Sequence, residues 1–356
     1  MDPEIEDIAR GPAAGRGVTP PPAPAPARQA LAMAVDRRYL PWALHLARQI
    51  DRLETQRRFD IFILSTEDVG PDVARHAPAA RFVQITDPAL LARLPHWGRF
   101  SRETGLRHLL PEVLGRDYDR LVYCDVDIWM HRAGLSDLFD TPMQGHAIMA
   151  VPDLKGWKLR KAPDDDAYFA GVGVPPERYL NAGVLLMDVQ ACLAAGTPAR
   201  LLGQLARAEK NARAFDQTTL NKVMNAEIGR LSPIWNFQLM PVSATLVARF
   251  DPVLVHFVAR KKPWHLGCSR DYYPYQLQYR AFLRDIGSDL PIPDHPPRPV
   301  RPRGPRSAWA WARRTLWMLW ARRRVGRILA GQIRTGGVGT GGVGMADVPR
   351  IAGLRG

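Results

Sequence analysis

The sequence predicts an α/β protein with a largely parallel central sheet, and two patterns carry that prediction. Short apolar runs alternate with segments of helical periodicity along the first two thirds of the chain, as in βαβ units. Carboxylates follow two of the apolar runs, at Asp36 and Asp125. Ligands of open α/β sheets bind beyond the carboxyl ends of the strands. The 356 residues, 46% of them apolar, suffice for one large domain with appendages.

The elements are expected in a strand–helix–strand order. Strands are predicted over Leu31–Val35, Phe59–Leu64 and Arg81–Ile85, with a helix over Trp42–Leu53 after the first strand. A helix over Thr104–Leu114 then precedes a buried strand, Arg120–Cys124. The remaining elements are strands over Ala147–Val151, Ala182–Met187 and Leu254–Val258, and a helix over Asp216–Met224.

Composition divides the chain into five parts. Residues 1–28 are rich in proline, glycine and alanine and are expected to be a disordered tail. The catalytic domain is expected over 29–288, followed by a linker rich in proline and arginine over 289–306. A basic, aromatic helix is expected over 307–330, and a glycine-rich disordered tail over 331–356.

The net charge of +14 indicates an anionic partner, but the charge is unevenly distributed. The stretch from Arg298 to Arg327 contains ten arginines and no acidic residue. Because the rest of the chain is only mildly basic, a nucleic-acid partner is not expected. Three widely spaced cysteines, an acidic start and the lack of a long apolar run favour a reducing, cytoplasmic location without a membrane span.

Asp125-Val-Asp127 is the first candidate for chemistry. Two carboxylates two residues apart, just past a buried strand, offer hard oxygen ligands to Mg²⁺ or Mn²⁺. The alternative interpretation is a surface turn, in which aspartate is common.

His256 lies in an apolar strand, where a histidine is more often a core residue than a metal ligand. The cations Arg260, Lys261 and Lys262 follow it closely, as a site for a metal-bound diphosphate requires. Asn181 and the pair Asp216-Gln217 could hold sugar hydroxyls, or could equally be a turn and a helix cap.

The order of these motifs resembles glycosyltransferase family 8, from about Ala30 to Trp264. Seven segments carry the resemblance: Leu31–Tyr39 with Asp36, Arg107–Glu112, Leu121–Asp127, Tyr179–Met187 with Asn181, Asp216–Asn221, Trp235–Phe237 and His256–Trp264. The resemblance implies the GT-A fold, a Rossmann-like sheet with flanking helices. It also implies a retaining, Mn²⁺-dependent transfer of galactose or glucose from a UDP-sugar to a saccharide or glycolipid, with Mg²⁺ as the alternative ion.

The resemblance also implies roles for individual residues. Asp125, Asp127 and His256 would hold the metal ion, and Gln217 and Asp216 would be the catalytic residues. The nucleotide would be bound by Ala34, Val35, Asp36, Val126 and Lys262. The donor sugar would be bound by Arg107, Asp153, Asn181, Ala182, Asp216 and Gln217. Gln217 is expected to stabilise an oxocarbenium-like state, because an amide is a poor nucleophile.

Three residues depart from the family pattern. Arg37-Arg38 stands where the family usually has Asp-Asn, and Ala259 replaces a usual glycine. These departures keep open a catalytically inactive scaffold that binds nucleotide sugar or membrane. A metal-dependent phosphohydrolase is the second alternative, because Asp-x-Asp after a strand also begins aspartyl-phosphate chemistry.

The segment 307–330 combines four tryptophans with arginines, a composition that suits the headgroup level of an anionic membrane. We therefore expect a peripheral location on the inner face of the plasma membrane. One alternative is a terminal helix whose tryptophans pack on the catalytic domain. Another is binding of single-stranded nucleic acid, which also uses arginine and aromatic side chains. The family's lipopolysaccharide enzymes, which act on membrane-embedded acceptors, favour the membrane.

Overall fold

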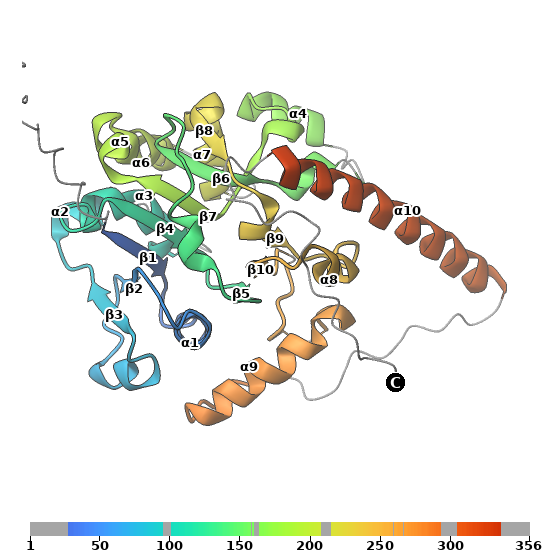
Figure 1. Cartoon of the computed structure of the whole chain (residues 1–356), viewed down its shortest axis with the longest axis horizontal. Coiled ribbons are helices and arrows are strands. Elements are labelled where there is room, and N and C mark those ends of the chain that lie inside the picture. The colour runs from blue at the N-terminus through green and yellow to red at the C-terminus, as the bar shows by residue number, and fades with distance from the viewer. Residues whose placement is uncertain are drawn as a thin grey trace, which may run out of the picture.

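The computed structural model describes residues 28–94, 101–157, 159, 164–207, 215–258, 260–265, 267–292 and 305–335. A sheet of seven strands in the order β3-β2-β1-β4-β7-β6-β8 forms its centre (Figure 1). The strands are β1 (Gln29–Ala34), β2 (Asp60–Ser65), β3 (Ala80–Gln84), β4 (Arg120–Cys124), β6 (Ile148–Pro152), β7 (Leu180–Asp188) and β8 (Ile228–Arg230). Every neighbouring pair is parallel except those that include β7. The expected α/β fold with a mostly parallel sheet is therefore confirmed.

Side chains of the strands alternate between two cores, one on each face of the sheet. In β1, Leu31 and Met33 enter one core, whereas Ala30 and Ala32 enter the other. This alternation follows from the two-residue period of a strand. Because both faces are buried, the strands read in the sequence as continuous apolar runs.

Helices cover both faces of the sheet. On one face lie α3 (Glu103–Leu114), α5 (Val189–Ala194), α6 (Thr197–Arg207) and α7 (Phe215–Met224). The other face is covered by α1 (Leu40–Leu53), α9 (Tyr273–Asp285) and a second sheet. Shorter helices are α2 (Pro88–Arg93), α4 (Asp165–Val172) and α8 (Val247–Phe250).

The second sheet has three short strands in the order β5-β10-β9. They are β5 (Ile128–Met130), β9 (Phe237–Gln238) and β10 (Leu254–His256). The expected strand over Leu254–Val258 is thus present but ends at His256, and it lies outside the central sheet. β10 runs antiparallel to β5 and parallel to β9, so it joins two segments that are far apart in the sequence.

The C-terminal helix α10 (Pro305–Thr335) is longer than expected at both ends. Its second half packs on the domain through Ala321, Val325 and Leu329, which are spaced four residues apart and are almost fully buried. Residues 331–335, expected in a disordered tail, continue this helix, and Pro305 and Arg306 of the expected linker begin it. Apart from Arg28, the expected tail over 1–28 lies outside the described residues, as do most of the linker and the residues from 336 onward.

The first half of α10 extends beyond the domain (Figure 1). Its side chains Trp309, Trp311 and Leu316 are 53–68% exposed. None of the helices in the described ranges is both long enough and apolar enough to cross a bilayer.

Candidate active site

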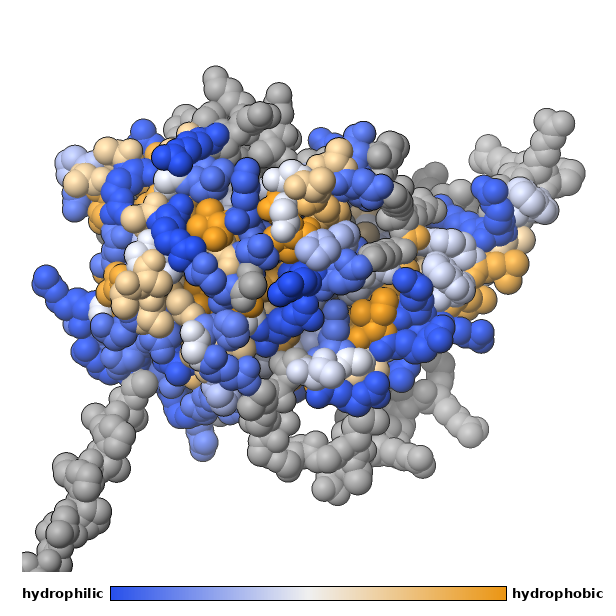
Figure 2. Space-filling model, turned by 90° about the horizontal axis from the view of Figure 1, so that it is seen from above, coloured by the Kyte–Doolittle hydropathy of each residue, from blue (hydrophilic) through white to orange (hydrophobic). Residues whose placement is uncertain are grey.

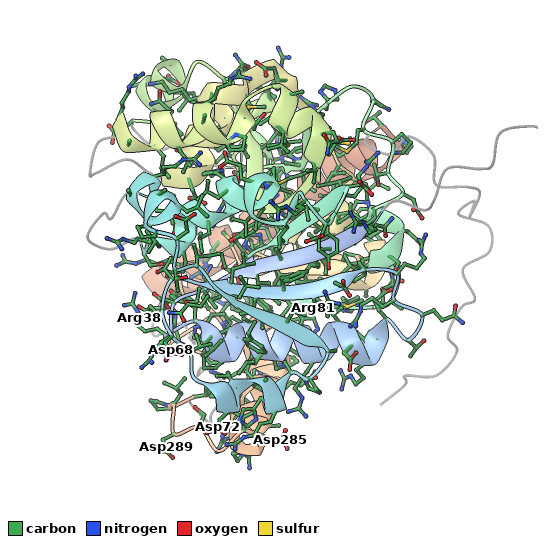
Figure 3. The ribbon with its side chains drawn as sticks, turned by 90° about the vertical axis from the view of Figure 1, so that its left-hand side faces the viewer. Arg38, Asp68, Asp72, Arg81, Asp285 and Asp289 are labelled. Carbon is green, nitrogen blue, oxygen red and sulfur yellow. The ribbon has the colours of Figure 1, made fainter. Side chains whose placement is uncertain are left out.

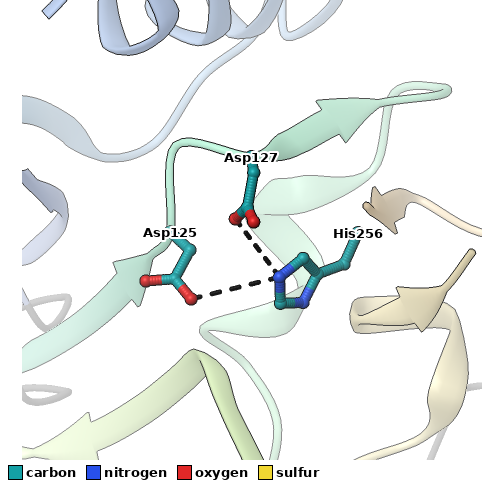
Figure 4. Close-up of side chains that lie close together, drawn as sticks. All are labelled: Asp125, Asp127 and His256. Carbon is teal, nitrogen blue, oxygen red and sulfur yellow. Dashed lines mark ion pairs between the residues drawn. The ribbon is translucent and has the colours of Figure 1, made fainter. Parts of the chain in front are cut away.

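Asp125, Asp127 and His256 form one cluster at the carboxyl end of β4 (Figure 4). Asp125 and Asp127 lie in the turn between β4 and β5, and His256 ends β10. The antiparallel register pairs Ile128 with His256, which brings the imidazole beside Asp127. His256 Nε2 lies 3.2 Å from Asp127 Oδ1 and 4.0 Å from Asp125 Oδ2. Two carboxylates and an imidazole that converge in this way can hold a divalent cation.

Lys262 places a fixed positive charge beside the cluster. Its Nζ lies 2.5 Å from Asp127 Oδ2 and donates to the carbonyl of Phe257 at 2.5 Å. Burial alone would raise the pKa of Asp127, but Lys262 and His256 outweigh it and hold that pKa well below its usual range. Asp127 is therefore a carboxylate, ready to bind a cation, at any physiological pH.

Asp125 has a different environment. Burial is the main influence and raises its pKa, against the attraction of the nearby Arg107 guanidinium. Arg107 Nη2 donates to Asp125 Oδ1 at 3.0 Å, and the Tyr123 hydroxyl donates to the same oxygen at 2.7 Å. Asp125 Oδ2 is the oxygen that faces His256, so the carboxylate is oriented by bonds to its other oxygen.

Asn236 orients the imidazole of His256. Its Oδ1 lies 2.9 Å from His256 Nδ1, so this ring nitrogen donates and leaves Nε2 as the ligand atom that faces the carboxylates. Asn236 Nδ2 in turn donates to Asn181 Oδ1 at 2.8 Å. Asn236 is fully buried and therefore links the metal cluster rigidly to the predicted sugar-binding residues.

Gly183 allows this arrangement. Its backbone carbonyl accepts from the N–H of Asp125 at 2.8 Å, because β7 pairs with β4. A side chain at this position would place its Cβ 2.3 Å from His256 Cε1. Only glycine leaves room for the imidazole here.

Arg107 connects the metal cluster to the start of α7. Its Nη1 lies 2.7 Å from Asp216 Oδ2 and donates to the carbonyl of Ala182 at 3.1 Å. Burial lowers the pKa of Arg107, but Asp125 and Asp216 raise it further, so the net shift is upward. A buried cation with two carboxylate partners is a rigid positioning group.

The predicted sugar-binding residues Asp153, Asn181 and Gln217 are hydrogen-bonded to one another. Asp153 Oδ2 accepts from Asn181 Nδ2 and from Gln217 Nε2, both at 3.0 Å. The other amide atom of Gln217, Oε1, accepts from the N–H of Ala182 at 3.2 Å. All these bonds fix side chains from β6, β7 and α7 at one edge of the central sheet.

The predicted nucleotide-binding residues Ala34, Val35 and Asp36 lie at the end of β1, beside β4. Asp36 is buried, and its carboxylate accepts from the N–H of Tyr39 at 3.0 Å and from Arg38 Nη2 at 3.1 Å. Val126, also predicted to bind the nucleotide, lies between Asp125 and Asp127 and is buried.

The two arginines that depart from the family pattern both make polar contacts with neighbouring residues. Arg37 donates its backbone N–H to Glu67 at 2.9 Å and its Nε to the carbonyl of Asp68 at 2.8 Å. Arg38 has a side chain that is 77% exposed, and Figure 3 shows it with Asp68 on the outer side of the molecule. Ala259 lies outside the described residues.

The structure thus joins the predicted metal-binding and sugar-binding residues in a single network. Two members of that network had no predicted role, Tyr123 and Asn236. Tyr123 is a polar-tipped residue within an apolar run, which is a weak signal. Asn236 belongs to the Trp235–Phe237 segment of the resemblance, but only the register of β9 beside β10 reveals its contact with His256.

Residues 30–268 match the family described as Glycosyl transferase family 8. A relative is the Lipopolysaccharide 1,3-galactosyltransferase of Salmonella typhimurium (strain LT2). It is 23% identical over 255 residues, which cover 67% of this chain and 68% of the relative.

Two solved structures show the same fold. The galactosyltransferase LgtC, in complex with donor and acceptor sugar analogues, superposes with a TM-score of 0.57 at 20% identity over 74% of this chain and 98% of LgtC. The bifunctional glycosyltransferase WbbM, in its apo form, gives a TM-score of 0.56 at 21% identity over 76% of this chain. The match spans about half of WbbM, 51% of its length. By its fold and by the family match over most of its described residues, this chain belongs to glycosyltransferase family 8.

Proposed function

We propose that this chain is a retaining hexosyltransferase that moves galactose or glucose from a UDP-sugar to a saccharide or glycolipid acceptor, with Mn²⁺ as its metal ion. The observation that carries the proposal is the Asp125–Asp127–His256 cluster, joined through Asn236 and Arg107 to a set of hydroxyl-binding side chains. The lipopolysaccharide named for the Salmonella relative supports a glycolipid acceptor.

The ligand set fits Mn²⁺. Carboxylate oxygens suit hard divalent cations, and the single imidazole favours Mn²⁺ over Mg²⁺. Asp125, Asp127 and His256 would hold the ion. When bound, the ion would supply positive charge that stabilises the departing nucleoside diphosphate.

Lys262 would also stabilise the departing nucleoside diphosphate, with little movement of its side chain. Its ammonium already lies against Asp127, at the place where a diphosphate would approach the cluster. A preorganised cation in a partly buried site stabilises developing negative charge at little reorganisation cost. Asp36, at the end of β1, would contact the nucleoside.

The sugar would be held by Arg107, Asp153, Asn181, Ala182, Asp216 and Gln217. Transfer breaks the bond from the anomeric carbon to the diphosphate oxygen and forms a bond to an acceptor hydroxyl oxygen. The hydroxyl proton leaves with the diphosphate. Gln217, with its amide fixed by Asp153 and Ala182, would stabilise the positive charge that develops on the sugar ring.

The test is turnover of UDP-galactose and UDP-glucose with and without Mn²⁺. We expect transfer or donor hydrolysis that depends on Mn²⁺ and that is lost in Asp127→Ala even in excess metal. Asp72→Asn is the matched control, because Asp72 lies on the outer surface (Figure 3).

The alternative functions give different outcomes in the same test. Undiminished transfer by Asp127→Ala would contradict the metal assignment. UDP binding without turnover of any sugar would favour the inactive scaffold, and release of inorganic phosphate from simple phosphate esters would favour a phosphohydrolase.

We also propose that the outer half of α10 meets an anionic membrane surface. Trp309, Trp311 and Leu316 are exposed there, and the neighbouring Arg313 and Arg314 are exposed as well. Figure 2 shows pale and orange residues at the right-hand end of the molecule, where Figure 1 places α10. Exposed aromatic side chains beside arginines are typical of helices that lie at the headgroup level.

A further inference from the structure

A cavity of about 730 Å³ lies between α4 and α10. Most of its wall is apolar, formed chiefly by Leu154, Trp157, Phe169, Met240, Val242 and Trp317, and the charged residues Lys155, Asp165, Asp166 and Glu177 also line it. This volume and lining are typical of sites that bind small organic molecules. None of these residues belongs to the predicted nucleotide, metal or donor-sugar site.

The cavity begins where the predicted donor-sugar site ends. Leu154 follows Asp153 directly, and its backbone N–H donates to Gln238 Oε1 at 2.8 Å. Gln238 lies beside His256 in the second sheet and leads, two residues later, to Met240 in the cavity wall. The segment that begins at Asp153 therefore contributes a carboxylate to the predicted sugar site and, directly afterwards, apolar side chains to the cavity wall.

The far wall is tied to the helix that carries Gln217. The Tyr168 hydroxyl in α4 lies 2.7 Å from Thr218 Oγ1 in α7 and 2.7 Å from the Tyr179 hydroxyl. Lys155 Nζ sits over the rings of Tyr168 and Tyr179, at 4.6 and 4.8 Å from their centroids. These contacts hold α4 in place and keep the Lys155 charge against aromatic faces.

Trp317 of α10 closes the cavity on the remaining side. It is partly buried, whereas its neighbours Leu316 and Trp320 are 68% and 47% exposed. Residue 317 lies beyond the family match at 30–268, so the cavity is completed by the C-terminal extension of this chain.

We propose that this cavity binds a linear alkyl chain attached to the acceptor sugar, with Trp317 as a determinant of acceptor specificity. The proposal rests on the proposed function, because only a transferase has an acceptor. The apolar lining favours an alkyl chain, and the adjoining Asp153 turn would place the attached sugar next to the donor.

The experiment uses n-octyl and methyl β-D-galactoside as probes, with a diazirine in the octyl chain for photolabelling of the full-length protein. We expect labelled peptides from 154–157 or 240–242, and labelling that excess unlabelled octyl galactoside suppresses but methyl galactoside does not. Affinity should rise by roughly twofold to fourfold per methylene over the first few carbons.

Two variants locate the binding site. Trp317→Ala and the cavity-filling Val242→Phe should each weaken octyl labelling at least fivefold without changing the affinity for methyl galactoside. Trp309→Ala is the matched control, because Trp309 lies on the same helix outside the cavity. Circular dichroism melting confirms that each variant is folded.

Labelling elsewhere on the chain, or labelling that both cavity variants leave unchanged, would overturn the proposal. Hydrolysis of UDP-sugar in the absence of acceptor distinguishes failure of the proposed function from failure of the alkyl site alone. If the wild type neither hydrolyses UDP-sugar nor transfers its sugar to either galactoside, the proposed function fails. If hydrolysis is present in wild type and in Trp317→Ala while octyl labelling is not confined to the cavity, only the alkyl site fails.

Discussion

Asn236 shows how one buried amide governs the metal cluster. Its Oδ1 accepts a hydrogen bond from His256 Nδ1 and its Nδ2 donates to Asn181, so it fixes which imidazole nitrogen faces Asp125 and Asp127. Such outer partners of a metal ligand are typically worth tenfold to a hundredfold in metal affinity. The cluster therefore depends on a residue that touches no metal.

Asn236→Ala should weaken Mn²⁺ binding by roughly tenfold to a hundredfold, because the His256 ring loses its orientation. Electron paramagnetic resonance titration of Mn²⁺ measures this directly. Asn236→Asp keeps an acceptor for Nδ1 and should retain more affinity than Asn236→Ala. Equal Mn²⁺ affinity in wild type and Asn236→Ala would show that the amide does not orient the ligand.

Gly183→Ala should abolish tight Mn²⁺ binding, because the new Cβ would lie 2.3 Å from His256 Cε1 and displace the ring. Gly203→Ala is the control, since a Cβ on that α6 glycine meets nothing within 4 Å. The same Mn²⁺ titration, together with a thermal melt, compares the two variants. Wild-type affinity in Gly183→Ala would mean that the ring can be accommodated elsewhere.

At the residue scale, the members of the Asp125–Asp127–His256 cluster stand out in the sequence better than the residues that orient them. Asp125 and Asp127 follow a buried strand, and His256 is polar within an apolar run, so each stands out locally. Asn236 and Tyr123 do not, because their roles depend on which strands become neighbours. Pairing between β9 and β10 brings Asn236 to His256, and no local pattern encodes that pairing.

At the scale of elements, strand positions are predictable but strand direction is not. The expected strand over Ala182–Met187 is present within β7, which nevertheless runs antiparallel between β4 and β6. Apolar periodicity reports burial and carries no information on direction. The strands β5 and β10 have only three residues each, too few to show a periodic pattern. They pair across more than a hundred residues, so the packed core and not the local sequence sets their pairing.

The contact of α1 with α9 contains a histidine that tests stability against pH. His45 packs on Tyr279 and Phe282, and its Nδ1 has no hydrogen-bond partner among the described residues. Burial lowers its pKa to about 3 from the ordinary value near 6.5. The unfolded chain therefore binds a proton that the folded chain does not between these values, and stability falls as the pH drops below about 6.5.

His45→Phe removes this proton while keeping an aromatic side chain in the contact. We expect the decrease in melting temperature between pH 7 and pH 5 to be smaller in His45→Phe than in the wild type. His108, whose pKa burial also lowers to about 3, leaves a residual decrease in both proteins. An equal decrease in melting temperature between pH 7 and pH 5 in His45→Phe and in the wild type would contradict the role of His45.

At the scale of the whole molecule, the two halves of α10 have different surroundings. Ala321, Val325 and Leu329 bury its second half on the domain, so deleting the helix would expose apolar core. The expected alternative, a helix whose tryptophans pack on the catalytic domain, holds only for Trp317, because Trp309, Trp311 and Trp320 are exposed. The outer half is the part that a membrane could reach. Substitutions in the outer half therefore test membrane binding while the packed half stays intact.

The triple variant Trp309→Ser, Trp311→Ser, Leu316→Ser should lose at least tenfold in binding to vesicles of anionic lipid while keeping its donor hydrolysis. Vesicle sedimentation measures the binding. Leu193→Ser with Leu277→Ser is the control, because both are exposed apolar residues on other helices. Unchanged sedimentation of the triple variant would contradict the membrane assignment.

The central claim is that Asp125, Asp127 and His256 hold the metal ion through which a UDP-sugar is bound. Calorimetric titration of UDP into the protein, with and without Mn²⁺, tests it most directly in wild type and Asp127→Asn. The account predicts UDP binding that Mn²⁺ strengthens at least tenfold in the wild type and does not strengthen in Asp127→Asn. An equal gain from Mn²⁺ in both proteins, or UDP affinity indifferent to Mn²⁺, would contradict it.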